Sequence, residues 1–150
     1  MSSIVVGAKL INAKVIETKL AQAFEEWARE DINNAYWDDQ FKDDKWSYAN
    51  ETRRKNGEVV TEPRNIYDLG KLYESGRESF SITQGGIDVT ASWNWDAKNS
   101  SGGGYAWYVH EGLSTNVEPR RWTDELQEPA RFDASELKKA LKSRIKVAFE

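Results

Sequence analysis

The clearest alternation of apolar and polar residues lies over residues 78–95, ESFSITQGGIDVTASWNW. Phe80 and Ile82 alternate with polar residues before Gly85 and Gly86, and every second residue that follows is apolar: Ile87, Val89, Ala91, Trp93 and Trp95. A period of two is typical of a strand with one buried face, and adjacent glycines accept the positive φ of a tight turn. The pattern predicts a β-hairpin that other elements must cover, because two strands alone are marginally stable.

Helical spacing dominates both ends of the chain. Apolar residues recur every three or four positions over about residues 8–41, including Leu20, Phe24 and Trp27, which predicts a long N-terminal helix. The polar pairs 33–34 and 38–39 favour a break or an end in its last third. Near the C-terminus, Asp133 and Glu136 have the spacing of a capping box. One apolar helical face follows them: Leu137, Ala140, Leu141, Ile145, Ala148 and Phe149.

Turn signals dominate the middle of the chain. Residues 44–66 show no sustained helical period, and Asn56-Gly57 is the strongest short-range signal for a type I′ turn, so we expect a protruding ribbon or long loop there. Asp68 is placed to cap a short helix that ends at Gly76. Residues 96–104, rich in glycine and serine, are expected to be a flexible loop that does not pack.

Three shorter segments carry weaker signals. The apolar residues 4–6 fit a short edge strand or a disordered arm. Residues 105–109 fit a third strand or a helix, and we favour a short helix or a switch from strand to helix. A brief helix is expected over about residues 121–128, because Pro129 cannot continue it.

Together these elements predict a single α+β domain over residues 1–150. Its antiparallel β-sheet, built on the central hairpin, packs against the long N-terminal helix and a C-terminal helix. A chain of 150 residues with 39% apolar residues can bury a core. The absence of cysteine excludes disulfides and thiolate metal sites. No run approaches the roughly 20 apolar residues of a membrane span, and no secretory signal is recognisable, so we expect folding in the cytoplasm.

The charge of the chain disfavours tight binding to nucleic acid. Lys and Arg number 21 against 25 Asp and Glu, a net charge of −4, whereas proteins that grip a phosphate backbone usually carry excess positive charge. Acidic residues concentrate in residues 25–44 and basic residues in residues 138–146. These segments are either solvated helix faces or surfaces that meet in neighbouring copies.

Candidate catalytic groups are few. The single histidine, His110, lies beside Glu111, so a zinc-protease helix with two histidines is impossible. A catalytic triad would have to use His110, but no Gly-x-Ser-x-Gly segment accompanies it, and a half-buried structural histidine is the simpler interpretation. The aspartate pairs 38–39 and 43–44 lack the spacing of a calcium loop, and residues 102–104 lack the lysine of a phosphate-binding loop. We therefore predict no catalytic residue, cofactor or metal site.

The tryptophans point to a binding surface instead. Four of the seven lie on or near predicted core faces: Trp27, Trp93, Trp95 and Trp107. Trp37, Trp46 and Trp122 are left over, and exposed aromatic side chains are enriched at protein interfaces. Two other functions stay open. A carbohydrate- or nucleic-acid-binding module would use Trp46 and Trp122 with the basic tip at 53–55, and a small glycosidase would use carboxylates such as Glu111 and Asp96.

Two segments carry a resemblance to a known family. RRKNGEVVTEPRNIYDLGKLYESGRESFSI, residues 53–82, resembles the Arg-Arg-x-x-Gly, Pro-Arg-x-Ile and Asp-x-Gly-x-Leu-x-x-Ser succession of tail-completion and neck proteins of tailed bacteriophages. YAWYVHEG, residues 105–112, and EPRRW, residues 118–122, are similar to the Tyr-Ala-x-x-Val-(His/Glu)-x-Gly and Pro-Arg-Pro-(Trp/Phe) elements of the same group. The chain departs from the group at Leu69, where Thr is common, and at Arg121, where Pro is common.

The resemblance implies a structural virion protein at the junction of phage head and tail, made in the host cytoplasm, with no membrane partner. Members of the group form rings, often hexamers, between the head connector (adaptor or stopper) and the tail tube or tail terminator, and genomic DNA passes through the lumen. An acidic or neutral lumen lets DNA slide without specific binding, which the net charge allows. We expect the assembly interface at Trp46, Arg53, Arg54, Lys55, Arg120, Arg121 and Trp122.

Overall fold

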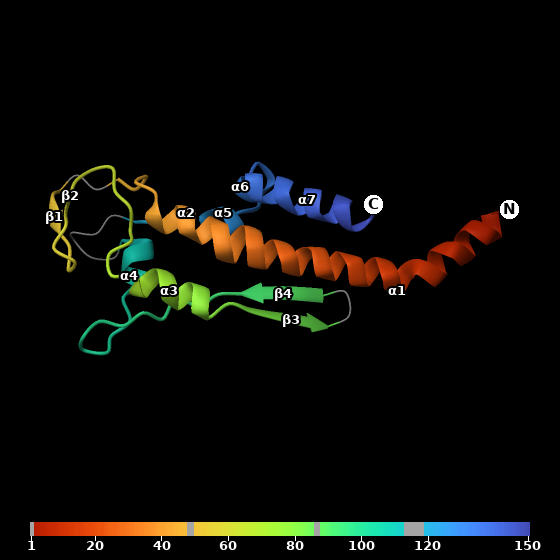
Figure 1. Ribbon diagram of the computed structural model, residues 1–150, viewed down its shortest axis with the longest axis horizontal. Coiled ribbons are helices and arrows are strands. Elements are labelled where there is room, and N and C mark those ends of the chain that lie inside the picture. Colours follow the sequence, from red (N-terminus) through yellow and green to blue (C-terminus); the bar gives the residue numbers. More distant parts are fainter. Residues whose placement is uncertain (1, 48–49, 86–87, 113–118) are drawn as a thin grey trace.

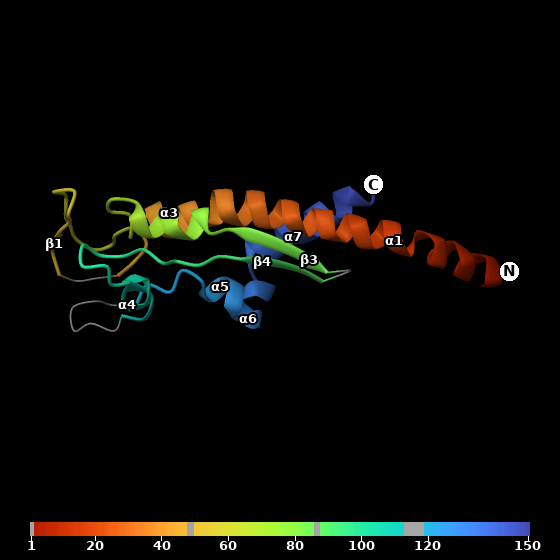
Figure 2. The same ribbon diagram turned by 90° about the horizontal axis from the view of Figure 1, so that it is seen from below.

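The computed structural model shows an elongated molecule built along one long helical rod (Figure 1). It describes residues 2–47, 50–85, 88–112 and 119–150, with side chains described from Lys14 onward. Both chain termini lie toward one end, here called the helix end, in both views (Figures 1 and 2). The short strands β1 (Thr52–Arg53) and β2 (Val59–Val60) lie at the opposite end, here called the ribbon end.

The rod consists of three helical segments without a break: α1 (Ser2–Glu26), the π-helix η1 (Trp27–Tyr36) and α2 (Trp37–Lys42). The predicted N-terminal helix is confirmed, but the break expected at 33–34 is wrong. A π-helix bonds each N–H to the carbonyl five residues earlier, as Trp37 does to Ile32. This spacing keeps Trp27, Ile32 and Trp37 in the core together, and their burial outweighs the weak helix propensity of two asparagines.

Residues 4–6 belong to α1. The expectation of a short strand or a disordered arm at this position is therefore wrong. The run is too short to show its own period, and the continuous rod that follows extends the helical backbone through it.

The predicted hairpin lies beside the rod. Strand β3 (Ser81–Gly85) pairs antiparallel with β4 (Asp88–Ser92), with Ile82 opposite Ala91. The alternation is confirmed, because Ala91 and Trp93 are half-buried while the residues between and beside them are exposed. Gly86 of the expected turn and Ile87 of the expected second strand lie outside the described residues. Strand β4 packs against α1, as Figure 2 shows.

The C-terminal helix α7 (Glu136–Ala148) is confirmed, but its cap differs from the prediction. Ser135 is the N-cap, and its Oγ accepts a hydrogen bond from the Lys138 N–H (3.2 Å). The capping box expected at Asp133 is therefore wrong by two residues. Serine and aspartate are both good N-caps, so the choice between two neighbouring candidates depended on where the preceding helix ended.

Helix α7 is held to the rod by two contacts of different kinds. The Trp27 indole Nε1 donates to the Leu137 carbonyl (2.8 Å). Toward the helix end, Arg144 Nε donates to Asp31 Oδ2 (2.6 Å), and Arg144 also lies 3.7 Å from Glu26. The acidic part of the rod thus meets a basic residue of its own chain, an arrangement that neither expectation for these charges included.

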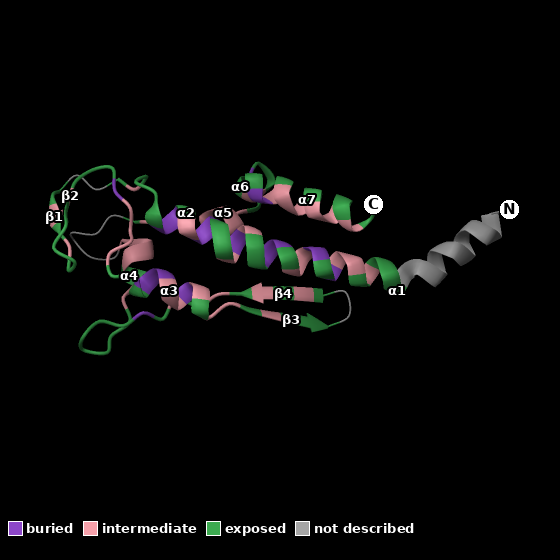
Figure 3. Cartoon of the chain, in the orientation of Figure 1, coloured by how far each residue is buried: buried purple, intermediate pink, exposed green. Residues whose placement is uncertain are grey.

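An aromatic cluster fills the space where the rod, the hairpin and α3 (Lys71–Glu78) meet. We define it as Trp37, Phe41, Tyr73, Trp93, Trp95 and Trp122. Trp37 contacts Trp93 and Trp95 edge-on, with ring centroids 5.6 and 4.9 Å apart, a favoured geometry for aromatic pairs. Figure 3 shows buried positions along the rod and α3. The core is therefore mainly aromatic.

Three tryptophans are placed differently from the prediction. Trp37 and Trp122, expected to be exposed, are 1% and 2% exposed, whereas Trp107, expected in the core, is 63% exposed on α4 (Ala106–Glu111). The burial of Trp37 depends on the five-residue spacing of the π-helix, and that of Trp122 depends on contacts distant in sequence. A helix as short as α4 carries too little periodicity to reveal which face is buried.

Helix α3 begins and ends differently from the prediction. Gly76 lies inside the helix and does not terminate it. Glycine is required there for a different reason, because a Cβ at this position would overlap the Trp95 indole. Gly70, with φ 83°, is the N-cap, and the predicted cap Asp68 instead accepts hydrogen bonds from Lys55 and Asn56.

Strands β1 and β2 form the predicted ribbon within residues 44–66. Its turn is not type I′, which requires positive φ at two residues, since only glycines have positive φ among the described residues. Gly57 (φ 91°) closes a three-residue loop, with Arg54 N–H donating to the Glu58 carbonyl (2.8 Å). The ribbon is a second two-stranded sheet, separate from the central hairpin.

Residues 96–104 are more ordered internally than the predicted loop. Lys98 and Gly104 form a bridge, and Asn99 Oδ1 accepts hydrogen bonds from the Ser101 and Gly103 N–H groups. The expectation that no part of the segment packs is wrong at Ala97, which is buried beside the aromatic cluster.

Helix α4 confirms the helical interpretation of residues 105–109. Helix α5 (Asp124–Gln127) is shorter than the helix expected over 121–128. Pro129 does end it but also begins α6 (Pro129–Asp133), because the first position of a helix needs no N–H donor.

The fold is therefore the predicted α+β arrangement, with the hairpin and α7 both packed on the N-terminal rod. None of the helices in the described ranges has the length and apolar composition that crossing a bilayer requires.

We expect Gly76→Ala to destabilise the protein by about 1–3 kcal/mol, because the added Cβ would push Trp95 out of the cluster. Helix propensity alone would make alanine more stable by about 1 kcal/mol. Urea unfolding of the variant and of the control Gly104→Ala, where a Cβ meets nothing, measures the difference. Equal stability of both variants would show that Trp95 does not need this space.

We expect Tyr36→Phe to lose about 1 kcal/mol at neutral pH, because Tyr36 Oη donates to Glu125 Oε2 (2.8 Å). Burial, and then this hydrogen bond, raise the pKa of Tyr36 far above its ordinary value. The folded state thus holds the phenol proton more tightly than the unfolded chain, so this stabilisation is complete below about pH 10 and is lost as pH rises through the raised pKa. Wild type should therefore lose more stability than Tyr36→Phe between about pH 9 and about pH 11 in urea unfolding. The exposed Tyr108→Phe is the control, and parallel alkaline losses in all three proteins would contradict the assignment.

Candidate functional site

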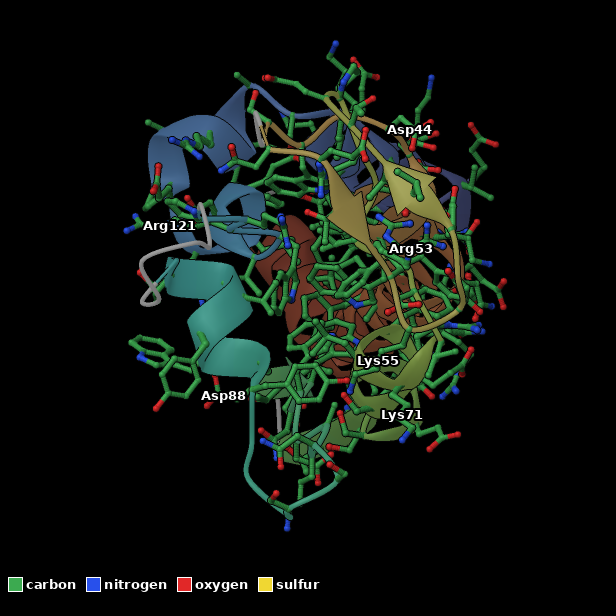
Figure 4. All side chains as sticks on the ribbon, turned by 90° about the vertical axis from the view of Figure 1, so that its left-hand side faces the viewer. Asp44, Arg53, Lys55, Lys71, Asp88 and Arg121 are labelled. Carbon is green, nitrogen blue, oxygen red and sulfur yellow. The ribbon has the colours of Figure 1, made fainter. Side chains whose placement is uncertain are left out.

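A basic cavity of about 560 Å³ lies at the ribbon end, bounded by the ribbon, residues 64–73, residues 98–100 and α4. Asp68 is the single carboxylate among its described lining residues. Seven basic residues line it: Arg53, Arg54, Lys55, Arg64, Lys71, Lys98 and Arg120. Figure 4 views this end and shows Arg53, Lys55 and Lys71 on one side of it, with Arg121 on the other.

Arg54 and Asp68 bind the ribbon to the body of the protein. Arg54 is 9% exposed and donates from Nη2 to the Asn65 carbonyl (2.5 Å) and from Nη1 to the Tyr67 carbonyl (3.0 Å). In the opposite direction, the Asp68 carboxylate accepts hydrogen bonds from the backbone N–H groups of Lys55 and residue 56 (both 3.2 Å). These charge-assisted hydrogen bonds fix the ribbon tip at a defined place.

Arg64 has a similar role on the other side of the ribbon and was not among the predicted site residues. It is 4% exposed and donates to the Asn50 carbonyl (2.6 Å), the Val60 carbonyl (3.1 Å) and Thr52 Oγ1 (3.0 Å). Its backbone pairs with that of Trp46. Arg64 stands between Pro63 and Asn65 and outside any basic run, so no local pattern marked it as a buried residue.

Four other cations have no ion pair within the part of the chain that is described: Arg53, Lys55, Lys71 and Lys98. All four are exposed. Lys71 and Lys98 come from segments in which no site residue was predicted, since neither stands in a basic run. Because no carboxylate pairs with these four cations in the described part of the chain, the lining of the cavity carries excess positive charge.

Tyr73 and Tyr105, which line the cavity, keep their phenol protons at neutral pH. Burial, and then the negative charge of Asp68, raise the pKa of Tyr105. Tyr73 Oη donates to Asp38 (2.7 Å), and burial, followed by this bond, raises the pKa of Tyr73. The hydrogen bond from Lys42, then that from Tyr73, lower the pKa of Asp38. The charge of the cavity is therefore set by its arginines and lysines.

His110 connects the segment 105–112 to the residues that follow Pro119. Its Nδ1 lies 2.8 Å from Glu111 Oε1 and its Nε2 lies 2.8 Å from Thr123 Oγ1, and its ring meets Trp122 edge-on at 4.7 Å. The histidine side chain is 12% exposed. The half-buried, hydrogen-bonded histidine that the sequence predicts is present.

The order hydroxyl, imidazole, carboxylate is also that of a catalytic triad, but the surroundings differ from one. Thr123 Oγ1 donates to Gln127 Oε1 (3.1 Å), which competes with donation to His110. Arg121 pairs with Glu111 (3.0 Å), and neither of the two cavities found among the described residues is lined by this chain of groups. The contacts instead tie α4 to α5.

The predicted interface residues are thus divided. Arg53, Arg54, Lys55 and Arg120 line the basic cavity. The other three do not: Trp46, Arg121 and Trp122. Trp122 is buried, so its expected place in this surface is wrong. Trp46 is half-buried, and its Nε1 donates to the Gln40 carbonyl (2.7 Å).

The glycosidase hypothesis needs two carboxylates at one cavity. The two carboxylates named for it do not share a cavity: Asp96 lines a second cavity of about 580 Å³ together with Glu74 and Glu78, whereas Glu111 lines neither this cavity nor the basic one. Within the described parts of the chain, no three His, Asp or Glu side chains gather as metal ligands.

No family model, curated protein or solved structure matches this chain. The phage neck group named by the motif residues therefore stays a prediction.

We expect Arg54→Met to destabilise the protein by about 1–3 kcal/mol, because the Asn65 and Tyr67 carbonyls would lose their donor. The neighbouring Arg53→Met, whose side chain is exposed and bonds only to the Gly57 carbonyl, should change stability by less than about 0.5 kcal/mol. Urea unfolding and limited proteolysis of the ribbon compare the two. Equal effects of the two substitutions would contradict the separate roles of these arginines.

Proposed function

We propose that this chain is a structural subunit of the neck or tail-completion assembly of a tailed bacteriophage, and that copies of it form a ring. The observation that carries the proposal is the exposure of large apolar side chains at both ends of an elongated molecule. Such exposure in a folded chain marks contact surfaces. A subunit with different contact surfaces at its two ends suits the heterologous contacts of a closed ring.

The exposed apolar residues that carry this argument come from three helices, and Val59 on β2 and Leu69 before α3 are also exposed. Trp107 and Tyr108 of α4 lie toward the ribbon end, at 63% and 53% exposure. Val15 and Ile16 of α1 and Val147 of α7 lie toward the helix end, and all are more than two-fifths exposed. The antiparallel packing of α1 and α7 keeps this second group together.

The motif residues support the proposal in a second way. Arg54, Asp68 and His110 are engaged in hydrogen bonds within the chain. They shape the ribbon end and are not arranged around a reacting centre. This use of polar residues suits a protein whose work is to present surfaces to neighbours.

In the proposed assembly the ring lies in the virion between the head connector or stopper and the tail tube or terminator. DNA passes through the lumen without specific binding, which the net charge of −4 favours. The alternative of a carbohydrate- or nucleic-acid-binding module is less well supported, because Trp122 is buried and offers no face for stacking.

Sedimentation velocity and negative-stain electron microscopy of the purified full chain test this proposal. We expect a closed ring in both measurements, and cryo-electron microscopy of particles should then locate this ring between head and tail. Trp107→Ser should weaken assembly without reducing stability, because this side chain is exposed in the single chain. The matched control is Lys142→Ser, an exposed polar position on α7. A wild-type monomer that never enters particles would sink the proposed function.

A further inference from the structure

Leu69 lies on the shared rim of two cavities. It is 54% exposed and lines both the basic cavity and a second cavity of about 580 Å³. The two cavities share four residues: Leu69, Gly70, Lys71 and Lys98. They are therefore neighbouring parts of one surface, with an apolar side chain where they meet.

The second cavity carries carboxylates on its far side. Glu74, Glu78 and Asp96 line it, and none of them has an ion pair within the described ranges. On the other side of Leu69, Arg53 and Lys55 belong to the basic cavity alone and likewise have no ion pair there. We call these two groups the acidic flank and the basic flank.

Leu69 is the exposed apolar side chain of the shared rim, with the cations Lys71 and Lys98 beside it. An exposed apolar side chain among unpaired charges of both signs is typical of a protein interface. Binding energy concentrates in a central side chain that is desolvated on contact, and flanking charges select the partner and its orientation. A surface that is basic on one flank and acidic on the other is complementary to itself after a half-turn about its centre.

We infer that this surface docks a second copy of the chain through a two-fold contact. Leu69 of each copy packs at the centre, and the basic flank of each copy faces the acidic flank of the other. This contact is additional to the heterologous contacts of the proposed ring and does not depend on them.

The charges argue against nucleic acid as the occupant. The seven cations of the basic cavity are a third of the 21 in the chain, and one of its 25 acidic residues lines the same cavity. The rest of the chain therefore carries 14 basic and 24 acidic residues. A phosphate backbone laid across Leu69 would meet the carboxylates of the acidic flank, whereas a second copy supplies both signs in the required order.

Charge exchange tests the contact in the full chain. The basic-flank variant is Arg53→Glu with Lys55→Glu, and the acidic-flank variant is Glu74→Lys with Glu78→Lys. Sedimentation equilibrium at low salt should show that each variant alone self-associates more than about tenfold more weakly than wild type, because like charges would then face each other. An equimolar mixture of the two should recover wild-type affinity, since both pairs of flanks become complementary again.

The matched control is Lys142→Glu with Lys146→Glu, two exposed positions on α7, which should leave the dissociation constant unchanged. Circular dichroism checks that every variant is folded, and Leu69→Ser should weaken association without any change of charge.

The inference is overturned by a monomeric wild type, by basic- and acidic-flank variants that associate as wild type does, or by a mixture that fails to recover. Rings formed equally by wild type and by both flank variants, with no change in association, would refute the docking surface alone. Pairing without rings or particle incorporation would refute the proposed function alone.

Discussion

Burial of the Trp37 ring is the interaction on which the rest of the structure depends. The ring lies near the C-terminal end of the rod, at the start of α2, and meets Trp93 and Trp95, which lie just beyond β4. Trp95 in turn occupies the space that Gly76 leaves on α3 and contacts Trp122. Segments from four parts of the chain therefore meet around Trp37 and Trp95. Each aromatic residue buries some 150–250 Å², so the cluster supplies much of the apolar burial that offsets the ordering of an elongated chain.

The ribbon end shows how neighbouring residues of the same type take different roles. Arg54 points into the body and satisfies backbone carbonyls, while Arg53 beside it is exposed. The alternation follows from the strand, whose successive side chains point to opposite faces. Internal arginines fix the shape of this end, and Arg53 and Lys55 add to the positive charge of the cavity that they line. The ribbon segment thus contributes both to the shape of this end and to the charge of its cavity, which connects the internal hydrogen bonds to the proposed contacts between copies.

The polar residues around His110 likewise make structural contacts and do not form a reacting centre. His110, Glu111 and Thr123 have the residue types of hydrolytic chemistry, yet their hydrogen bonds join α4 to α5 and their carboxylate is paired with Arg121. The large apolar side chains that remain exposed lie at the ends of the molecule instead. A chain that uses its polar groups internally and leaves apolar groups at its ends has the physical character of an assembly subunit.

The sequence by itself determined the elements whose pattern is local and long enough to show a period: the N-terminal helix, the central hairpin, the ribbon and α7. It also revealed Arg53, Arg54 and Lys55, because they are adjacent. Only the tertiary structure decided that Trp37 and Trp122 are buried, that Asp68 holds the ribbon, and that Leu69, Lys71 and Lys98 share a rim with Glu74 and Asp96. These facts depend on the π-helical register and on contacts between segments distant along the chain. Local periodicity reports which way a side chain points along its own element, and it carries no information on which other element stands opposite.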